Sequence, residues 1–320
     1  MHEFELINNF FSKLSKHNAS ALKLNDDVFF DKKKKIVISV DTYNNGIHFF
    51  NFKKPDLVIK KIIRSSISDL ICKGVKPKYY FVSMSADKKY LTKVILKKIT
   101  KSLAEEQKKF NIHLSGGDIT NSKNLSFTVT SLGFSDKIIC RNKTVSGDDI
   151  YVSGNIGDSY VGLSILKEKI KKTDKFQKNY FIKKYYLPDL PIRLISILNK
   201  YCNSSIDISD GLFDDLLKLT NKQKTKFNVY LDKVPTSLNF NKIIKNKKLS
   251  KKNLIFHGDD YQVIFTAPKK FRKLIQLKAK KMNQKVSIIG EITNKSRKNL
   301  LISGGKILNL SNFKGYSHKF

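Results

Sequence analysis

The sequence predicts an α+β protein built from two domains. Its 320 residues, 40% of them hydrophobic, are enough for two cores of ordinary size. Strand-like and helix-like segments are mixed in both halves without strict β-α-β alternation, which favours two α+β domains over one doubly wound sheet. A polar stretch, RNKTVSGDD at 141–149, interrupts the pattern. We therefore expect an N-terminal domain at 1–141 and a C-terminal domain at 142–320.

In the first half, apolar strands alternate with amphipathic helices. KIVISVD at 35–41 has the composition of a buried strand, and residues 56–73 and 90–108 carry apolar side chains at helical spacing. NLSFTVTSLGF at 124–134 predicts a second strand. These segments predict the core of the N-terminal domain.

The second half shows the same mixture. The expected strands lie at 150–154, 227–231, 261–267 and 286–292, and the expected helices near 158–168, 189–200 and 268–282. SSIDISDGLFDDL at 204–216 predicts a strand that turns into a helix at Asp210 and Gly211. Its acids have a simple structural interpretation, in which Ser209 or Asp210 caps the helix and Asp214 and Asp215 favour its positive end.

The charge and the cysteines limit the class of protein. The formal net charge is +35, yet lysines are spread from Lys13 to Lys319 and only five residues are arginine, so a dedicated nucleic-acid-binding face is not expected. No secretory signal and no apolar run long enough to cross a membrane is present, so we expect a cytoplasmic protein without membrane association. The three cysteines are far apart, which indicates neither disulfides nor a zinc site.

Many aspartates stand at strand ends, at glycine-marked turns or inside apolar segments, where an uncompensated charge is expensive. This set includes Asp26, Asp27, Asp41, Asp69, Asp118, Asp207, Asp210, Asp259 and Asp260. Carboxylates without soft ligands favour hard divalent cations, and no single D-x-D-x-D-G calcium loop occurs. Scattered aspartates therefore suggest several magnesium ions that share their coordination with phosphates.

Two glycine-rich segments suggest phosphate binding. SGGD at 115–118 is expected to be a turn after a strand, and VSGNIGDS at 152–159 a turn that opens a helix. Neither is a Walker A loop, and protein-kinase signatures are missing. A glycine turn by itself is more often structural, but with the acids these segments indicate phosphoryl transfer.

A set of motifs follows in order along the chain: NDD (25–27), SVD and GIHF (39–49), SDL (68–70), GGD (116–118), Arg141 before SGDDIYVSGNIGD (146–158), IDISDGL (206–212), GDDYQVIFT (258–266) and GYSHKF (315–320). This ordered set resembles the thiamine-monophosphate kinase family of the aminoimidazole ribonucleotide synthetase superfamily. The resemblance spans nearly the whole chain. It implies an aminoimidazole ribonucleotide synthetase-like fold whose N-terminal domains pair in a homodimer, joining their strands into a β-barrel.

The resemblance also implies an activity and a site. The reaction would transfer the γ-phosphoryl group of ATP directly to thiamine monophosphate with several Mg²⁺ ions. The implied magnesium ligands are Asp27, Ser39, Val40, Asp41, Asp69, Asp118, Asp207 and Asp210. The implied ATP contacts are Gly117, Asp118, Arg141 and Ser209, and the implied substrate contacts are His48, Asp259 and Tyr316. Asp207, Asp210 and Arg141 would carry catalysis.

Several positions depart from the family pattern. Asn25 stands where the family usually has Gly, Val40 where it has Thr or Ser, and Tyr316 where it has Trp. Asn45 and Asp259 stand where it has Glu. Val40 can offer a metal only its backbone carbonyl, and Asp259 is one methylene shorter than Glu.

Two other functions remain open from the sequence. One is another ATP-dependent synthetase of the same superfamily, of the aminoimidazole ribonucleotide synthetase type. The other is a basic nucleic-acid-binding protein, which would bind polyanions tightly and with steep salt dependence. His48 and Tyr316 also have structural interpretations, as a hydrogen-bonded half-buried histidine and as part of a hydrophobic patch.

Overall fold

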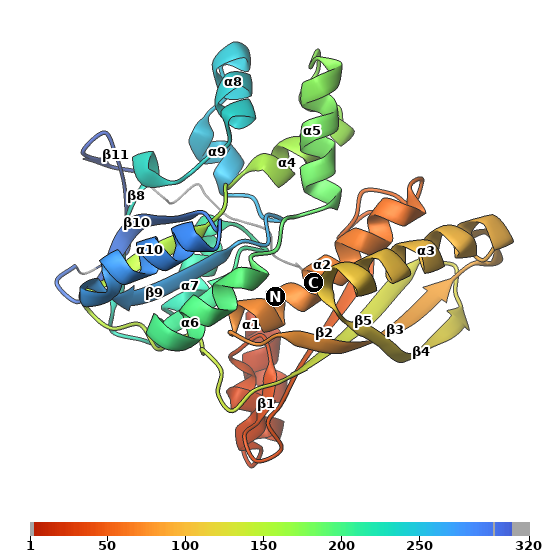
Figure 1. Ribbon diagram of the computed structural model, residues 1–320, viewed down its shortest axis with the longest axis horizontal. Helices are drawn as coiled ribbons and strands as arrows, with labels where there is room; N and C mark the ends of the chain where they lie inside the picture. The colour runs from red at the N-terminus through yellow and green to blue at the C-terminus, as the bar shows by residue number, and fades with distance from the viewer. Residues whose placement is uncertain (1–2, 297, 309–320) are drawn as a thin grey trace.

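Two mixed β-sheets, one in each half of the chain, carry the helices of this protein in a computed structural model that describes residues 3–296 and 298–308 (Figure 1). The chain begins with α1 (Glu3–Leu6) and short helical turns that run to Leu24. Tyr316, a predicted substrate contact, lies outside the described residues. In the described part of the chain, no helix combines the length and apolar character needed to span a bilayer.

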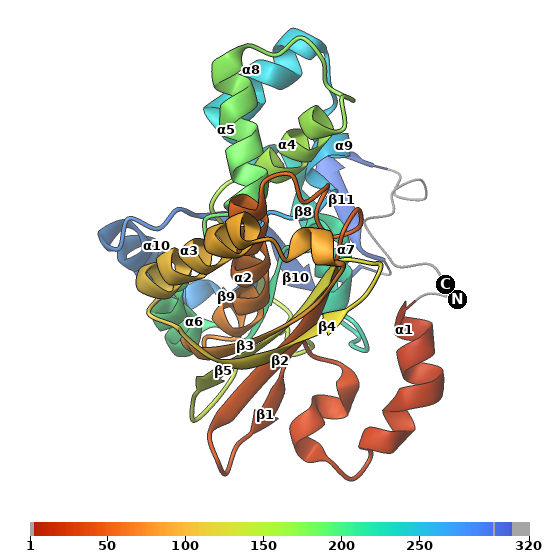
Figure 2. The ribbon, with the colours of Figure 1, turned by 90° about the vertical axis from the view of Figure 1, so that its right-hand side faces the viewer.

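The first sheet has the strand order β1-β2-β5-β3-β4. Its strands are β1 (Phe29–Asp31), β2 (Ile36–Asn44), β3 (Pro77–Ala86), β4 (His113–Asn121) and β5 (Ser126–Phe134). The helices α2 (Pro55–Cys72) and α3 (Lys93–Phe110) lie together on one side of this sheet (Figure 2). Ile62 and Ile67 of α2 share a buried core with Phe127 and Val129, which alternate along β5 as a strand with one buried face requires.

The opposite face of the first sheet is exposed and partly apolar. Val40 of β2 is 62% exposed, and Phe81 and Phe134 are also exposed. Register places Val40 opposite Thr130 and Thr130 opposite Phe81, so apolar and small side chains form a row across the sheet. The sheet does not close into a barrel within one chain.

The second sheet has the order β12-β11-β8-β10-β6-β9-β7. Its strands are β6 (Asp148–Ser153), β7 (Ser204–Asp207), β8 (Lys226–Tyr230), β9 (Val263–Pro268), β10 (Val286–Thr293), β11 (Leu300–Ser303) and β12 (Lys306–Ile307). Its helices are α4 (Asp158–Leu166), α5 (Lys175–Tyr186), α6 (Ile195–Tyr201), α7 (Leu212–Leu219), α8 (Leu238–Lys247), α9 (Lys251–Ile255) and α10 (Arg272–Lys281). The α+β class predicted from the sequence is therefore confirmed.

One predicted turn is instead part of a strand. SGGD at 115–118 lies inside β4, where the register with β3 shifts between Tyr80 and Val82 and makes a bulge. Gly117 has φ +157°, and a Cβ there would lie 1.8 Å from the Val82 carbonyl oxygen. The glycine is needed because the backbone of β3 approaches too closely for any side chain.

Helix α2 joins the two halves. Arg64 forms a buried two-pronged ion pair with Glu106 of α3, and its Nη1 donates a hydrogen bond to the Pro188 carbonyl oxygen at 3.1 Å. The buried Lys73, which caps the C-terminal end of the helix, donates to the Ser205 carbonyl oxygen of β7, also at 3.1 Å. These contacts bring the C-terminal end of α2 against the strand that carries Asp207.

Candidate active site

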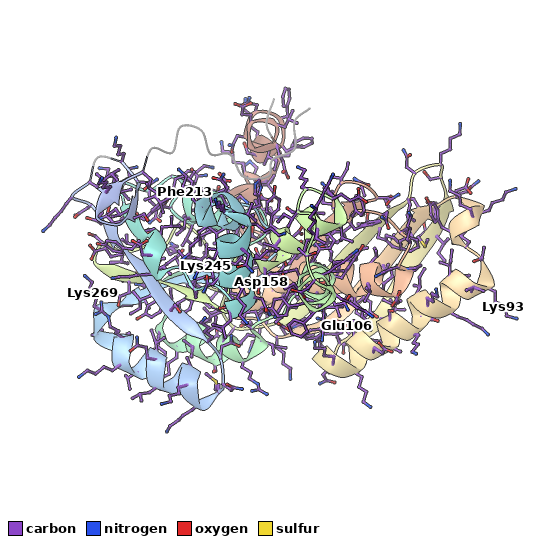
Figure 3. All side chains as sticks on the ribbon, turned by 90° about the horizontal axis from the view of Figure 1, so that it is seen from above. Lys93, Glu106, Asp158, Phe213, Lys245 and Lys269 are labelled. Carbon is purple, nitrogen blue, oxygen red and sulfur yellow. The ribbon has the colours of Figure 1, made fainter. Side chains whose placement is uncertain are left out.

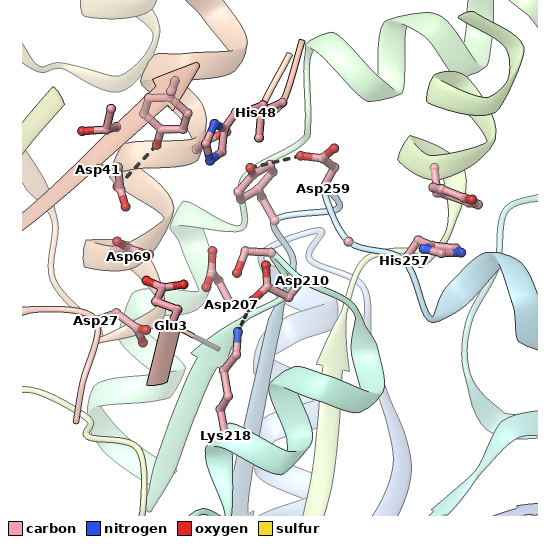
Figure 4. Close-up of a pocket in the computed structure, with 18 of the residues that line it drawn as sticks. Glu3, Asp27, Asp41, His48, Asp69, Asp207, Asp210, Lys218, His257 and Asp259 are labelled. Atoms are coloured by element: carbon pink, nitrogen blue, oxygen red, sulfur yellow. Dashed lines mark hydrogen bonds and ion pairs between the residues drawn. The ribbon is translucent and has the colours of Figure 1, made fainter. Parts of the chain in front are cut away.

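A cavity of about 540 Å³ lies between the two halves, and most of the predicted site residues line it. Figure 4 shows Asp27, Asp41 and Asp69 of the first half on one side, with Asp207 and Asp210 of the second half facing them. Ser209, Arg141, His48 and Asp259 line the same cavity. Acids far apart in the sequence therefore meet in one place.

The acids repel one another, and burial strengthens this effect. Burial, together with the charge of Asp27, raises the pKa of Asp41 to about 7 and that of Asp207 to about 8. Burial, followed by the charges of Asp41 and Asp207, also raises the pKa of Asp69 well above its ordinary value. Such a cluster can ionise fully only when cations compensate it.

The donor chemistry fits hard divalent cations. Every predicted ligand side chain that lines the cavity offers carboxylate oxygen, which Mg²⁺ prefers. Within residues 3–296 and 298–308, no group of three or more His, Cys, Asp or Glu side chains forms a ready-made metal site. The carboxylates surround a shared space, an arrangement suited to ions that take their remaining ligands from phosphates and water.

Asp27 differs from the other acids because it forms ion pairs with two basic side chains. Burial alone would raise its pKa, but the Arg141 guanidinium, 2.7 Å away, and the Lys73 ammonium, 2.8 Å away, hold the pKa well below its ordinary value. Arg141 is buried, and its Nε has no hydrogen-bond partner among the described residues. Arg141 lines the acid-lined cavity, and a guanidinium in such a place is suited to bind a phosphate oxygen.

Ser39 and Val40 point to opposite faces of the first sheet. Ser39 is buried, and its Oγ donates a hydrogen bond to Asp69 Oδ2 at 2.5 Å. The exposed Val40 side chain points away from the cavity, as the two-residue period of a strand dictates. Neither residue lines the cavity in this chain.

Gly117 and Asp118 also lie away from the cavity. Register places Asp118 beside Ser83, Ser83 beside Thr128, and Thr128 beside Thr42. Thr128 alternates with buried residues of β5, so this row belongs to the exposed face of the sheet. The structure of one chain therefore does not bring Asp118 to the other acids.

The turn after β7 is organised by Asp215. Its Oδ2 accepts hydrogen bonds from the backbone N–H groups of Ser209, Asp210 and Gly211 at 3.0 to 3.1 Å. The interpretation in which Ser209 or Asp210 caps α7 is thus wrong, since Gly211 stands at the cap position and Asp215 satisfies the turn from within the helix. The side chains of Ser209 and Asp210 do not cap the helix and instead line the cavity.

Asp207 and Asp210 have different surroundings. Asp207 is 2% exposed and accepts a hydrogen bond from Ser68 Oγ at 2.8 Å. Asp210 forms an ion pair with Lys218 at 2.5 Å (Figure 4). Lys218 also lies 2.7 Å from Asp215. Lys218 lines the cavity but was not predicted from the sequence.

His48 and Asp259 lie away from Asp27, Asp207 and Asp210, at the other end of the cavity (Figure 4). His48 Nδ1 accepts the Asn44 N–H at 2.9 Å, so the neutral ring carries its proton on Nε2. Asp259 accepts hydrogen bonds from Lys61 and from the Tyr261 hydroxyl.

Several other cavity residues were missed by the sequence analysis. Glu3 of α1 lines the acidic end, and His257 stacks on Tyr160 with ring centroids 3.7 Å apart at the other side. The spacing of Lys218 after Asp214 and Asp215 is a weak helical signal for an ion pair. No local pattern in the sequence pointed to Lys61, because Asp259, with which it forms an ion pair, lies 198 positions further along the chain.

The fold and the acid-lined cavity place the chain among proteins related to AIR synthase. Residues 17–135 match the family model described as AIR synthase related protein, N-terminal domain. The chain is also 32% identical over 300 residues to the thiamine-monophosphate kinase of Buchnera aphidicola from Acyrthosiphon pisum, covering 91% of each chain. It is 30% identical over 328 residues to that of Haemophilus influenzae, covering 99% of this chain and 98% of the relative. The chain belongs to the thiamine-monophosphate kinase family, a family of phosphotransferases.

Solved structures agree with this assignment. AaThiL complexed with AMPPCP and TMP is 25% identical, has a TM-score of 0.84, and matches over 99% of this chain and 97% of its own. The thiamine-monophosphate kinase of Stenotrophomonas maltophilia, 22% identical with a TM-score of 0.77, shares the fold over 94% of this chain and 98% of its own. These similarities do not favour the alternative of an aminoimidazole ribonucleotide synthetase.

Proposed function

We propose that the chain transfers the γ-phosphoryl group of ATP to thiamine monophosphate, giving thiamine diphosphate and ADP. Family membership supports this reaction, and so does the similarity to a structure that holds an ATP analogue and TMP. The observation that carries the proposal is the meeting of Asp27, Asp41, Asp69 and Asp207 in one cavity that also contains His48 and Asp259. An acidic end would hold the phosphates through cations, and the His48 end would hold the rest of thiamine monophosphate.

Several Mg²⁺ ions fit the acidic end. We assign their binding to Asp27, Asp41, Asp69, Asp207 and Asp210, with Ser39 supporting Asp69 and Val40 offering at most its carbonyl oxygen. When bound, the ions neutralise the negative oxygens of donor and acceptor so that the two can approach. Ser68 orients the Asp207 carboxylate for this role.

ATP would bind through Arg141 and the turn at Ser209. Arg141 offers its unpaired Nε and a planar guanidinium, which suits a phosphate better than a lysine ammonium does. Its charge would also stabilise the transferring phosphoryl group. The turn held by Asp215 presents Ser209 to the cavity in a fixed position.

The acceptor needs no general base. A phosphate monoester is already ionised at neutral pH, so its oxygen can attack the γ-phosphorus without first losing a proton. Direct transfer without a phosphoenzyme follows, with Asp207 and Asp210 acting through the ions they hold.

We assign residues 1–141 to a domain that binds ATP and Mg²⁺ and mediates dimerisation, and residues 142–320 to a domain that completes the site. Pairing of two first sheets through their exposed faces into a barrel would cover Val40, Phe81 and Phe134. Gly117 and Asp118 lie on the same sheet, so the second copy would bring them to the ATP and metal sites of the assembled homodimer. We assign the reaction to the cytoplasm, where ATP is abundant and the three free cysteines stay reduced.

A single assay tests the reaction. Purified protein with Mg²⁺ and ATP should release ADP only when thiamine monophosphate is present, with one thiamine diphosphate formed per ADP. Protein that binds ATP and Mg²⁺ but shows no stimulation by thiamine monophosphate would contradict the proposal. Binding of nucleic acid is a poorer explanation, because lysines such as Lys93 and Lys269 lie at opposite ends of the molecule and form no single stripe (Figure 3).

A further inference from the structure

A buried lysine lies directly behind Asp259. Lys61 of α2 is 2% exposed, and its Nζ lies 2.7 Å from Asp259 Oδ1 across the boundary between the two halves. Asp259 lines the cavity, whereas Lys61 does not. The lysine can therefore influence a bound molecule only through the carboxylate.

The surroundings of Lys61 hold its ammonium group in one place. Nζ stands 4.1 Å from the centroid of the Tyr185 ring and 5.5 Å from that of Tyr261, and it donates to the Tyr185 carbonyl oxygen at 3.4 Å. Burial lowers the pKa of Lys61, and the charge of Asp259 opposes this shift. Because burying an ion pair seldom stabilises a fold more than apolar packing would, the pair points to a functional role.

The bonds to Asp259 are unevenly distributed over its two oxygens. Lys61 and the Tyr261 hydroxyl, at 3.2 Å, both reach Oδ1, and no hydrogen bond from the described residues reaches Oδ2. The backbone of Asp259 is fixed as well, since it has φ +71° and its N–H donates to the Ser209 carbonyl oxygen at 3.0 Å. Oδ2 thus remains as the acceptor for a molecule in the cavity.

We propose that Lys61 is a positioning and specificity residue for thiamine monophosphate, an inference that rests on the proposed function. Lys61 holds Asp259 with Oδ1 occupied and cancels its charge. The remaining oxygen then accepts one hydrogen bond from a neutral donor, such as the amino group on the aromatic ring of the substrate, without requiring a cation. In this arrangement the Lys61–Asp259 pair recognises a hydrogen-bond donor of the substrate, while the acidic end of the cavity binds the charged phosphates through cations.

A double-mutant cycle tests this inference through steady-state kinetics. Lys61→Met should raise the KM for thiamine monophosphate about tenfold or more, the size expected for losing one hydrogen bond to a charged group. The KM for ATP and kcat should change less than about threefold. In an Asp259→Asn background, Lys61→Met should add no more than about a twofold change. Equal effects in both backgrounds, or equal losses for both substrates, would overturn the inference.

Two controls separate this role from folding and from the reaction itself. Lys60→Met removes the neighbouring lysine, which pairs with Glu105 at the surface, and should leave both KM values unchanged. If Lys61→Met does not fold, Lys61→Arg replaces it: a normal KM for thiamine monophosphate supports the inference, and equal increases in both KM values refute it. Wild-type protein that makes no thiamine diphosphate would refute the proposed function before any variant is compared.

Discussion

At the scale of single residues, Asp207 is the most buried of the acids that line the cavity. It lies at the end of β7, 2% exposed, and its carboxylate is oriented by Ser68. Asp207→Asn keeps the shape and the hydrogen bond from Ser68 but removes the charge that would bind a cation. We expect turnover to fall by about three orders of magnitude or more, the scale of losing one strong electrostatic contact to the transition state.

The fold should survive this substitution. The metal-free Asp207→Asn protein should unfold at or above the wild-type temperature, because a repulsive buried charge has been removed. Thermal unfolding followed by circular dichroism, alongside the ADP assay, separates the two effects. Activity close to that of the wild type would remove Asp207 from the proposed metal set.

The raised carboxyl pKa values predict how magnesium binding depends on pH. In the metal-free protein Asp41, with a pKa of about 7, and Asp207, with a pKa of about 8, hold protons at pH 6 that Mg²⁺ must displace. The apparent affinity for Mg²⁺ should therefore rise with pH, by up to about tenfold per unit for each proton released, and level off above pH 8. Titration calorimetry in buffers of different ionisation enthalpy measures both the affinity and the protons released.

The stability of the metal-free protein should change in the opposite direction. A raised folded-state pKa means that the folded form binds more protons than the unfolded form between about pH 4 and pH 8, so stability falls as pH rises through this range. Added Mg²⁺ should raise the stability of the folded protein most at high pH. A melting temperature in EDTA that does not fall between pH 6 and pH 8.5 would contradict the prediction that the buried acids repel one another in one cluster.

At the scale of elements, the site depends on two loops that touch through their backbones. Gly258 packs on the turn after β7, where a Cβ would lie 1.7 Å from the Ser209 carbonyl oxygen. Gly258→Ala should therefore separate the loop of Asp259 from the turn of Ser209 and Asp210. We expect a loss of about 3 kcal/mol in the free energy of unfolding, together with a raised KM for thiamine monophosphate.

Gly147→Ala is the matched control for this change. Gly147 also has a restricted backbone, with φ +93°, but nothing lies within 4 Å of a Cβ built there. Its replacement should lose only about 1–2 kcal/mol, the cost of the backbone conformation, and leave both KM values unchanged. Denaturant unfolding of both variants measures the difference, and equal losses would show that the contact between loops is unimportant.

At the scale of the whole molecule, the exposed face of the first sheet predicts an assembly. Val40→Glu places a charge on that face and should shift the proposed homodimer toward monomer. Leu238→Glu changes a residue that is even more exposed, on α8 of the other half, and should leave the mass unchanged. Light scattering after size exclusion measures the mass of each, and a wild-type protein that is monomeric at all concentrations would refute the barrel.

The same variant tests whether the assembly matters for the reaction. If Gly117 and Asp118 of a second copy complete the site, monomeric Val40→Glu should lose activity although Asp27, Asp41, Asp69 and Asp207 are untouched. Full activity in a monomer would show that Asp118 is not needed. It would also leave the cavity of a single chain as the complete site.

The sequence by itself determined the local structure and the chemical type of the site. Period-two and helical apolar patterns predicted β2, β5, β6 and α2 because such patterns follow from which face of an element is buried. The scattered aspartates and the ordered motifs were enough to predict phosphoryl transfer and the family. Repulsion among Asp41, Asp69 and Asp207 was not visible, because it depends on distance in space.

Only the tertiary structure decided which residues meet. It brought Asp27, Asp69 and Asp207 together but placed Asp118 on the other face of the sheet, because strand register fixes the side on which each residue lies. It also turned SGGD into a strand bulge through the approach of β3, and it put Lys61 behind Asp259 across the boundary between the two halves. Contacts between distant segments arise from packing of whole elements, and no local pattern in one chain encodes them.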